Sequence, residues 1–321
     1  MDNTAVLNAI RVRRIAGNAS SGPALSVKDA ELEILTAKTD PIGRDHPDSV
    51  FYARVFTPAL PVGVNPRTGT STVDRVLLIH RLREVAAQVG FTRFEAVSPK
   101  TDGELPELDI GVERAALGLD TRWLPAVDNR GEGIFIGFRR DAIQQWLHQP
   151  AVIRRHEQLL QGFKAWLAEH PKSQREFPGA DYLLLHTLSH LLLTVIALDC
   201  GYPASSIRER VYASDLGYGI LLYTASPDAE GTLGGLVKAG ERIHDHLQAA
   251  LEWGRLCSND PVCAGHRPDD PYERRFLHGA ACHGCLLIAE TSCEQGNDFL
   301  DRTLVVPTVD DGHAAFFPDP P

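Results

Sequence analysis

The chain has 321 residues, 43% of them hydrophobic and 23% charged, and its formal net charge is −10. This is the composition of a globular protein with a sizeable core, in one large domain or two of ordinary size. The negative charge argues against a protein that coats nucleic acid through a uniformly basic surface, although it allows a local basic stripe. Met1–Ala9 lacks a basic flank followed by an apolar run. The sequence therefore predicts no secretory signal and a cytoplasmic location.

The first half of the chain predicts strands and helices in alternation. Phe51–Thr57 alternates aromatic or β-branched residues with others, which is typical of a strand. Val73–Val89 has apolar residues at helical spacing and is expected to be a helix. Glu132–Phe138 predicts a second strand, followed by a helix over Ala142–His148. The amphipathic segment Ile153–Ala168 predicts a longer helix.

A polar segment flanked by prolines, Pro171–Pro178, is the best candidate for a domain boundary. A long apolar helix over Tyr182–Leu198 follows, and polar residues interrupt its apolar run, so it is typical of a buried helix rather than a membrane span. We then expect a short helix over Ser205–Tyr212, a strand over Tyr218–Thr224 and a helix over Gly240–Arg255.

The order of these elements indicates the fold class. Helices and strands alternate without a regular βαβ period, so the expected class is α+β (irregular α/β). We expect a mixed sheet, a long buried helix and a four-cysteine zinc site near the C-terminus. The expected division is an N-terminal α+β region over residues 1–175 and a second domain over residues 176–321. The acidic, proline-rich tail Asp310–Pro321 is expected to be poorly ordered.

Five of the six cysteines lie in one short C-terminal stretch, a pattern that in a reducing compartment favours a metal site over disulfides. Four of them form the pattern Cys257-x5-Cys263, eighteen intervening residues, and Cys282-x2-Cys285. Two short-range pairs brought together by a loop suit tetrahedral zinc. Four thiolates fill the tetrahedron and leave no position for water, so the expected site is structural.

Other interpretations of these cysteines stay open. They could be small buried side chains of a cysteine-rich core, or Cys282 and Cys285 could form a redox pair resembling the thioredoxin dithiol. The ligand set is open as well, because Cys293, His266 or His283 could replace one of the four cysteines.

Two histidines of the long helix, His186 and His190, lie four residues apart and share one face. This spacing can grip a metal or a phosphate, but the zincin pattern needs Glu where Thr187 stands. The favoured interpretation is a polar seam that is hydrogen-bonded to the neighbouring sheet. The alternative is a metal-dependent nuclease or hydrolase, centred on the two histidines and an acidic residue such as Asp199 or Asp215.

Other catalytic or nucleic-acid-binding patterns are sparse. The sequence has no P-loop, nucleophile elbow or kinase loop, so we expect no catalytic residues and no ATP hydrolysis by this chain alone. Short arginine clusters are more typical of a solvated surface than of phosphate contacts. These clusters are Arg11–Arg14, Arg139–Arg140, Arg154–Arg155 and Arg274–Arg275.

Several motifs occur in order along the second half of the chain. They are His186–His190, Gly219–Thr224, Gly231–Leu236, Cys257–Cys263, Gly279–Cys285, Glu290–Glu294, Asn297 and Leu300–Arg302. Together they resemble the MrfA-type zinc-binding (MZB) domain, and in particular the DrmB-like proteins of the DISARM anti-phage system. The resemblance covers roughly residues 110–306 and is weaker before the boundary near Pro171.

This resemblance implies a zinc site built from Cys257, Cys263, Cys282 and Cys285. It also implies a partner, because the domain occurs fused to, or encoded beside, DNA helicases of the DEAD/DEAH-like superfamily. We therefore expect a non-catalytic Zn²⁺-binding subunit that partners a DNA helicase in anti-phage defence and contributes to DNA binding. Neither a membrane nor a small-molecule substrate is expected. A structural scaffold without nucleic acid is a third hypothesis, and the longer members of the family make this chain resemble a short or split form.

Overall fold

The computed structural model describes residues 26–57, 71–88, 90–91, 115, 123–171, 173, 175–224, 234–270 and 277–318. Its six strands form one sheet in the order β1-β2-β3-β4-β6-β5, and every pairing is antiparallel. The strands are β1 Ile42–Gly43, β2 Phe51–Phe56, β3 Val73–Ala87, β4 Ala126–Phe138, β5 Ile207–Ser214 and β6 Gly217–Thr224.

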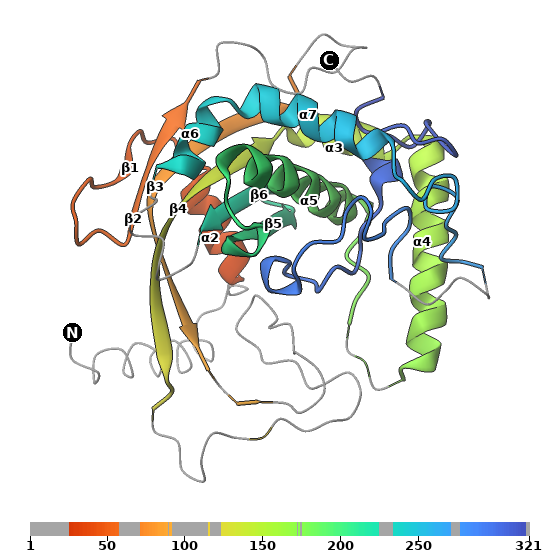
Figure 1. The fold of residues 1–321 in the computed structure, drawn as a ribbon, viewed down its shortest axis with the longest axis horizontal. Helices are drawn as coiled ribbons and strands as arrows, with labels where there is room; N and C mark the ends of the chain where they lie inside the picture. Colours follow the sequence, from red (N-terminus) through yellow and green to blue (C-terminus); the bar gives the residue numbers. More distant parts are fainter. Residues whose placement is uncertain are drawn as a thin grey trace.

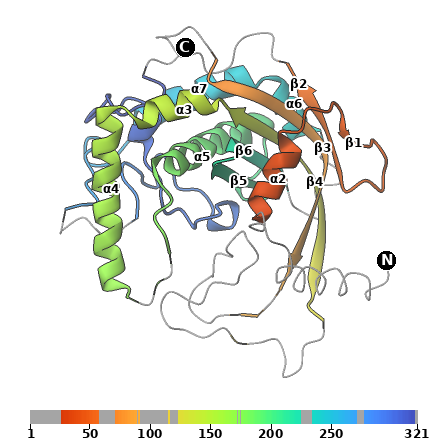
Figure 2. The same ribbon diagram turned by 180° about the vertical axis from the view of Figure 1, so that it is seen from behind.

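Helices cover both faces of this sheet (Figures 1 and 2). The helix α5 crosses one face, where α6 and α7 also lie, and α2 packs on the other face. The α-helices are α2 Val27–Leu35, α3 Arg140–Leu147, α4 Pro150–Glu169, α5 Ala180–Cys200, α6 Gly235–Glu241 and α7 Ile243–Arg255. The structure also has three short 3-10 helices, which are η1 Ala204–Ser206, η3 Glu290–Ser292 and η4 Arg302–Leu304.

The helix α5 forms the centre of the larger core. Of its 21 residues 15 are buried, because it touches β5 and β6 on one side and α7 on another. Among the described residues it is the one helix long and apolar enough to suit a membrane span, but 72% of that span is buried inside the protein. The predicted buried helix is thus confirmed as the element around which the second half of the chain packs.

The strand β3 corrects the helix predicted over Val73–Val89. Val76 belongs to the core on the α5 face, whereas Leu77 and Ile79 belong to the core on the α2 face. Leu78 points toward α6, since a side chain on Gly240 would meet it. A strand buried on both faces carries consecutive apolar residues, which removes the period of two that would have distinguished it from a helix.

The strand β5 corrects the short helix predicted over Ser205–Tyr212. Only η1 is helical there, and Ile207, Glu209 and Val211 point toward the larger core in strand alternation. The apolar pair Ile207 and Val211 is four residues apart, a spacing that places two side chains on one face in a helix and in a strand alike. The pattern was therefore ambiguous.

The C-terminal tail is also ordered further than its composition predicts. Phe316 and Phe317 are buried, and their backbone N–H groups donate to the carbonyls of Leu304 and Val305 at 2.9 and 3.0 Å. The Trp146 ring nitrogen donates to the carbonyl of Ala314 at 2.8 Å. The prediction of a poorly ordered tail was wrong for the described residues up to 318.

The α+β class and the remaining predicted elements are confirmed. The strands near residues 51 and 218, the strand ending at Phe138 and the helices α3, α4 and α5 lie where the sequence placed them, and α7 begins at Ile243 after the separate helix α6. The sheet expected to be mixed is antiparallel in all its pairings. Because β4 pairs with β6, residues on both sides of position 175 share one sheet, and the division at 175 stays a prediction about where the zinc-binding domain begins.

Candidate metal centre

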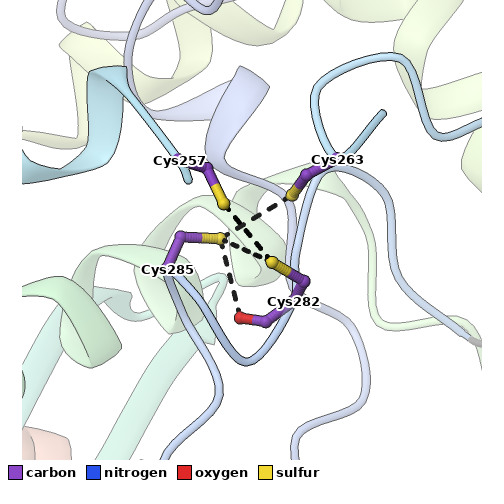
Figure 3. A group of neighbouring side chains, drawn as sticks. All are labelled: Cys257, Cys263, Cys282 and Cys285. Atoms are coloured by element: carbon purple, nitrogen blue, oxygen red, sulfur yellow. Dashed lines mark hydrogen bonds between the residues drawn. The ribbon is translucent and has the colours of Figure 1, made fainter. Parts of the chain in front are cut away.

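The four cysteines of the predicted zinc site lie together at the C-terminal end of α7 (Figure 3). Cys257 follows the last turn of α7, Cys263 closes the following loop, and Cys282 and Cys285 come from one tight turn. The sulfurs of Cys257 and Cys282 are 3.4 Å apart, and those of Cys263 and Cys285 are 3.8 Å apart. All four sulfurs are within 4.8 Å of one another.

These separations fit a tetrahedral zinc ion. Four sulfurs at about 2.3 Å from zinc lie about 3.8 Å from each other, whereas a disulfide brings two sulfurs to about 2 Å. The sulfurs of Cys282 and Cys285 are 3.8 Å apart, and all four thiols are unpaired. Cysteines that only fill space in a core have no reason to direct four sulfurs at one point. The geometry therefore favours the metal site over the redox pair and over simple packing.

Polar hydrogens around the cluster support negatively charged sulfur. The backbone N–H of Asn259 points at the Cys257 sulfur at 3.4 Å, and that of Gly284 points at the Cys282 sulfur at 3.3 Å. The side-chain amide of Asn259 also lies 3.3 Å from the Cys282 sulfur. A side chain at position 284 would meet the hydroxyl of Ser258 at 2.9 Å, so glycine lets the two cysteine loops approach.

A buried arginine holds the first cysteine loop in place. Arg302 donates to a carboxylate oxygen of Asp260 and to the carbonyls of Gly254 and Arg255 at the end of α7. Asp260 in turn accepts from the backbone N–H groups of Cys257 at 2.9 Å and Ala264 at 3.1 Å. The loop thus closes around one carboxylate, and the arginine brings positive charge to a site of four thiolates.

The thiols interact electrostatically even without a metal. A hydrogen bond from Cys285 outweighs the opposing effect of burial and, with the charge of Arg302, lowers the pKa of Cys263 to about 6. The same hydrogen bond, together with burial, raises the pKa of Cys285. A bound zinc would hold all four sulfurs as thiolates.

A second buried ion pair positions the Cys282–Cys285 turn. The Asp301 carboxylate accepts from Arg155 Nε of α4 at 2.7 Å and from the backbone N–H groups of Ala280 and Thr303 at 3.1 Å. Burial raises the pKa of Asp301, but the Arg155 charge and these hydrogen bonds outweigh it and hold that pKa below its usual value. The turn is thereby anchored to α4.

None of the three residues considered as substitute ligands belongs to the four-cysteine cluster. Cys293 belongs to another group, and His283 is exposed. His266 lines a pocket of about 480 Å³ beside Cys263 and Cys282, and its ring nitrogens are not among the clustered ligand atoms.

A second group of side chains that could hold a metal ion lies between α5 and β5. It contains His186, His190, Glu209 and Cys293, whose ligand atoms also lie within 4.8 Å of one another. The histidines of the predicted polar seam do face the sheet, as expected. Their acidic neighbour is Glu209, and not one of the two aspartates that the sequence suggested.

Neither suggested aspartate belongs to that second group. Asp199 pairs with Arg242 and His246, and Asp215 is fully exposed beside Arg140. A glutamate at an inward position of a strand is the signal that would have found Glu209. It was missed because β5 was predicted to be a helix.

Comparison with known proteins places the chain in a family. The model of the MZB family, described as the MrfA Zn-binding domain, matches residues 188–286, which include the four clustered cysteines. The expected zinc cofactor is therefore confirmed at the level of the domain. The chain is also 38% identical over 247 residues to a Bacillus paralicheniformis protein described as DISARM protein DrmB. That match covers 76% of this chain and 43% of the relative, so the chain spans less than half of the relative's length. The chain belongs to the family of the DISARM protein DrmB.

Proposed function

We propose that this chain is a non-catalytic, zinc-stabilised subunit that works with a DNA helicase in cytoplasmic anti-phage defence. The observation that carries the proposal is its 38% identity, over 76% of its length, with a DISARM protein. The zinc ligands are Cys257, Cys263, Cys282 and Cys285, whose sulfurs converge at tetrahedral distances. The ion joins the end of α7 to the turn that α4 anchors.

The chemistry of the two side-chain clusters supports a non-catalytic role. Four cysteine ligands leave zinc no open position for a water or a substrate. The histidines His186 and His190, on which a nuclease would depend, have no exposed surface. A scissile phosphate would have to enter the core of the protein to reach them.

Exposed apolar side chains beside the zinc cluster support a protein partner on this face. Leu256 and Val262 directly precede two of the cysteines, and 71% and 79% of their surfaces are exposed. Trp253 on the last turn of α7 is 45% exposed. An apolar patch on a protein surface is typical of a contact site for another protein, and we propose that these side chains form one. We assign this face to the helicase subunit.

The arginine clusters are the side chains that could bind the phosphates of DNA. In the described part of the chain Arg139 faces Asp141, Arg140 faces Asp215 and Arg155 faces Asp301. Arginines already paired with carboxylates contribute little to phosphate binding. The clusters Arg11–Arg14 and Arg274–Arg275 lie outside the described residues. We therefore propose that the chain contributes to DNA binding only as part of the assembled complex, and not through these paired arginines.

Protection of cells against phage tests the proposed role. Cells that carry the complete system should lose protection when Cys282 is replaced by Ser, because the zinc site loses a ligand. The matched control is Cys200→Ser, since Cys200 lies outside both clusters. Equal protection by the two variants would contradict the proposal.

Co-purification with the helicase subunit tests the partner surface. Leu256→Ser combined with Val262→Ser should keep the zinc and the fold but lose the helicase, whereas Val85→Ser, at an exposed position of β3, should retain it. A gel-shift series at increasing salt, with and without the helicase, measures how much the chain contributes to DNA binding.

The hydrolase hypothesis has its own test. Metal-dependent DNA cleavage by the chain alone, abolished in folded His190→Ala, would establish it.

A further inference from the structure

We propose that His186, His190, Glu209 and Cys293 form a second, structural site for a divalent transition metal of the zinc class. Both histidines come from α5, the glutamate from β5 and the cysteine from the residue after η3. The four ligand atoms lie within 4.8 Å of one another, and all four side chains are buried. This site is separate from the four-cysteine cluster on which the proposed function rests.

The hydrogen bonds of the two rings show which nitrogen faces the centre. His186 Nδ1 lies 3.1 Å from the carbonyl of Phe299, and His190 Nδ1 lies 2.8 Å from that of Leu286. A carbonyl oxygen only accepts, so each Nδ1 carries a hydrogen. In a neutral ring Nε2 then presents a lone pair, and both Nε2 atoms face Glu209 Oε1, at 2.8 and 3.2 Å. Lone pairs that converge on a carboxylate oxygen repel it unless protons or a metal ion lie between them.

The sulfur of Cys293 is also surrounded by donors. It accepts from the backbone N–H groups of Asn297 at 3.1 Å and Gln295 at 3.4 Å, and it lies 3.1 Å from His186 Nε2. Backbone hydrogens directed at a sulfur favour its thiolate form. Cys293 is thereby arranged as an anionic ligand.

The glutamate is oriented in the same way. The hydroxyl of Ser189 contacts Glu209 Oε2, which leaves Oε1 to point at the rings. The backbone N–H of Glu294 reaches Oε1 at 3.3 Å. Hydrogen bonds of this kind, to the second nitrogen of a histidine and to a ligating carboxylate, surround most protein metal sites.

Charge balance favours a metal over protons alone. Two neutral imidazoles, one carboxylate and one thiolate neutralise a divalent ion. Without the ion, the cluster would need two imidazolium cations against two anions with no contact to water. Burying four charges in this way carries a large desolvation cost.

The donor set and spacing fit zinc. Mixed nitrogen, oxygen and sulfur ligands suit this metal, and its tetrahedral edges for such ligands are about 3.3 to 3.6 Å. Three of the separations, between 2.8 and 3.2 Å, are shorter than that range, so shifts of about half an ångström would admit the ion. All four positions are filled by protein. The site would therefore join α5, β5 and the C-terminal loop rather than activate water.

Metal analysis of the purified chain tests this second site. The wild-type chain, expressed with zinc and kept reduced, should hold about two zinc ions. Glu209→Gln keeps the size of the side chain but removes its charge, and it should reduce the content to about one. The matched control Asp199→Asn, at an exposed carboxylate that also pairs with a histidine, should leave the content unchanged.

X-ray absorption at the zinc edge of the wild-type chain decides the question even if Glu209→Gln does not fold. Two sites predict an average of about 2.5 sulfur and 1.5 nitrogen or oxygen ligands per zinc. One zinc per chain with sulfur ligands only would overturn the second site and leave the four-cysteine site intact. Equal zinc in wild type and folded Glu209→Gln would overturn it too.

Discussion

Single buried ion pairs hold the loops that carry the zinc cysteines. Arg155 and Asp301 join α4 to the Cys282–Cys285 turn, and Arg302 and Asp260 join α7 to the first cysteine loop. Each arginine contacts more than one acceptor through its planar guanidinium, a geometry that lysine does not offer. Removing one partner of such a pair leaves a buried charge, which is costlier than losing a surface contact.

Asp301→Asn should destabilise the protein in a pH-dependent manner. Because the pKa of Asp301 is held below its unfolded value, its stabilisation is present above about pH 4 and is lost as the pH falls through the folded pKa. The variant should be less stable than the wild type at pH 7, and the gap should narrow as the pH falls. Urea unfolding between pH 7 and pH 3 measures it. Acid also protonates the thiolates, but it does so in both proteins. A gap that stays constant over this range would contradict the assignment.

Arg302→Ala should also destabilise the protein, by an amount that stays constant with pH near neutrality. It leaves the carboxylate of Asp260 without its cation and the last carbonyls of α7 without a donor. We expect a loss of about 3 to 5 kcal/mol in the free energy of unfolding and weaker zinc retention. Chemical denaturation and metal analysis check these two effects. A loss of less than about 1 kcal/mol would show that the pair is not required.

At the scale of elements, the long helices were predictable, whereas the short helices α2 and α6 and two strands were not. α4 and α5 are long and have apolar residues at helical spacing or throughout, so their type was evident. β3 is covered on both faces, and its apolar run carries no alternation. β5 places Ile207 and Val211 at a spacing shared with helices. The tertiary covering of a strand is not encoded in its local pattern, which is why both were missed.

The candidate site was predictable to a similar degree. The spacing of the cysteine pairs identified the residues that the fold brings together. The sequence could not show that Glu209 and Cys293 lie beside the two histidines. These side chains come together only because β5 pairs with β6 and the loop after η3 folds back over α5. Such contacts depend on topology rather than on spacing along the chain.

The C-terminal segment packs as part of the core, so Phe316→Ala should destabilise the protein. The Phe316 ring packs edge-on against Trp146 of α3 with centroids 5.7 Å apart, and the residue is only 6% exposed. Truncation of a buried aromatic ring costs about 3 to 5 kcal/mol. Thermal unfolding should report a clear destabilisation, whereas Val309→Ala, at an exposed position of the same tail, should be nearly neutral. Equal melting temperatures for the two variants would show that the tail is not docked.

For the whole molecule, zinc removal should destabilise the cysteine loops and leave the sheet folded. The four-cysteine site joins loops that contain no regular strand or α-helix, so the metal supplies much of their stability. After chelation, hydrogen exchange should accelerate over residues 256–266 and 278–288 and, with the loss of the second ion, over residues 290–297. The central strands β3 and β4, with neighbours on both sides, should keep their protection. Uniform acceleration across the sheet would show that zinc holds the entire fold.

The central claim is that the four clustered cysteines bind zinc as a closed structural site. The most direct measurement is X-ray absorption at the zinc edge of the Glu209→Gln chain, in which the four-cysteine site is the remaining metal centre. The account predicts one zinc with sulfur ligands alone, at about 2.3 Å. Nitrogen or oxygen ligands in place of sulfur, or a folded chain that contains no zinc, would contradict it.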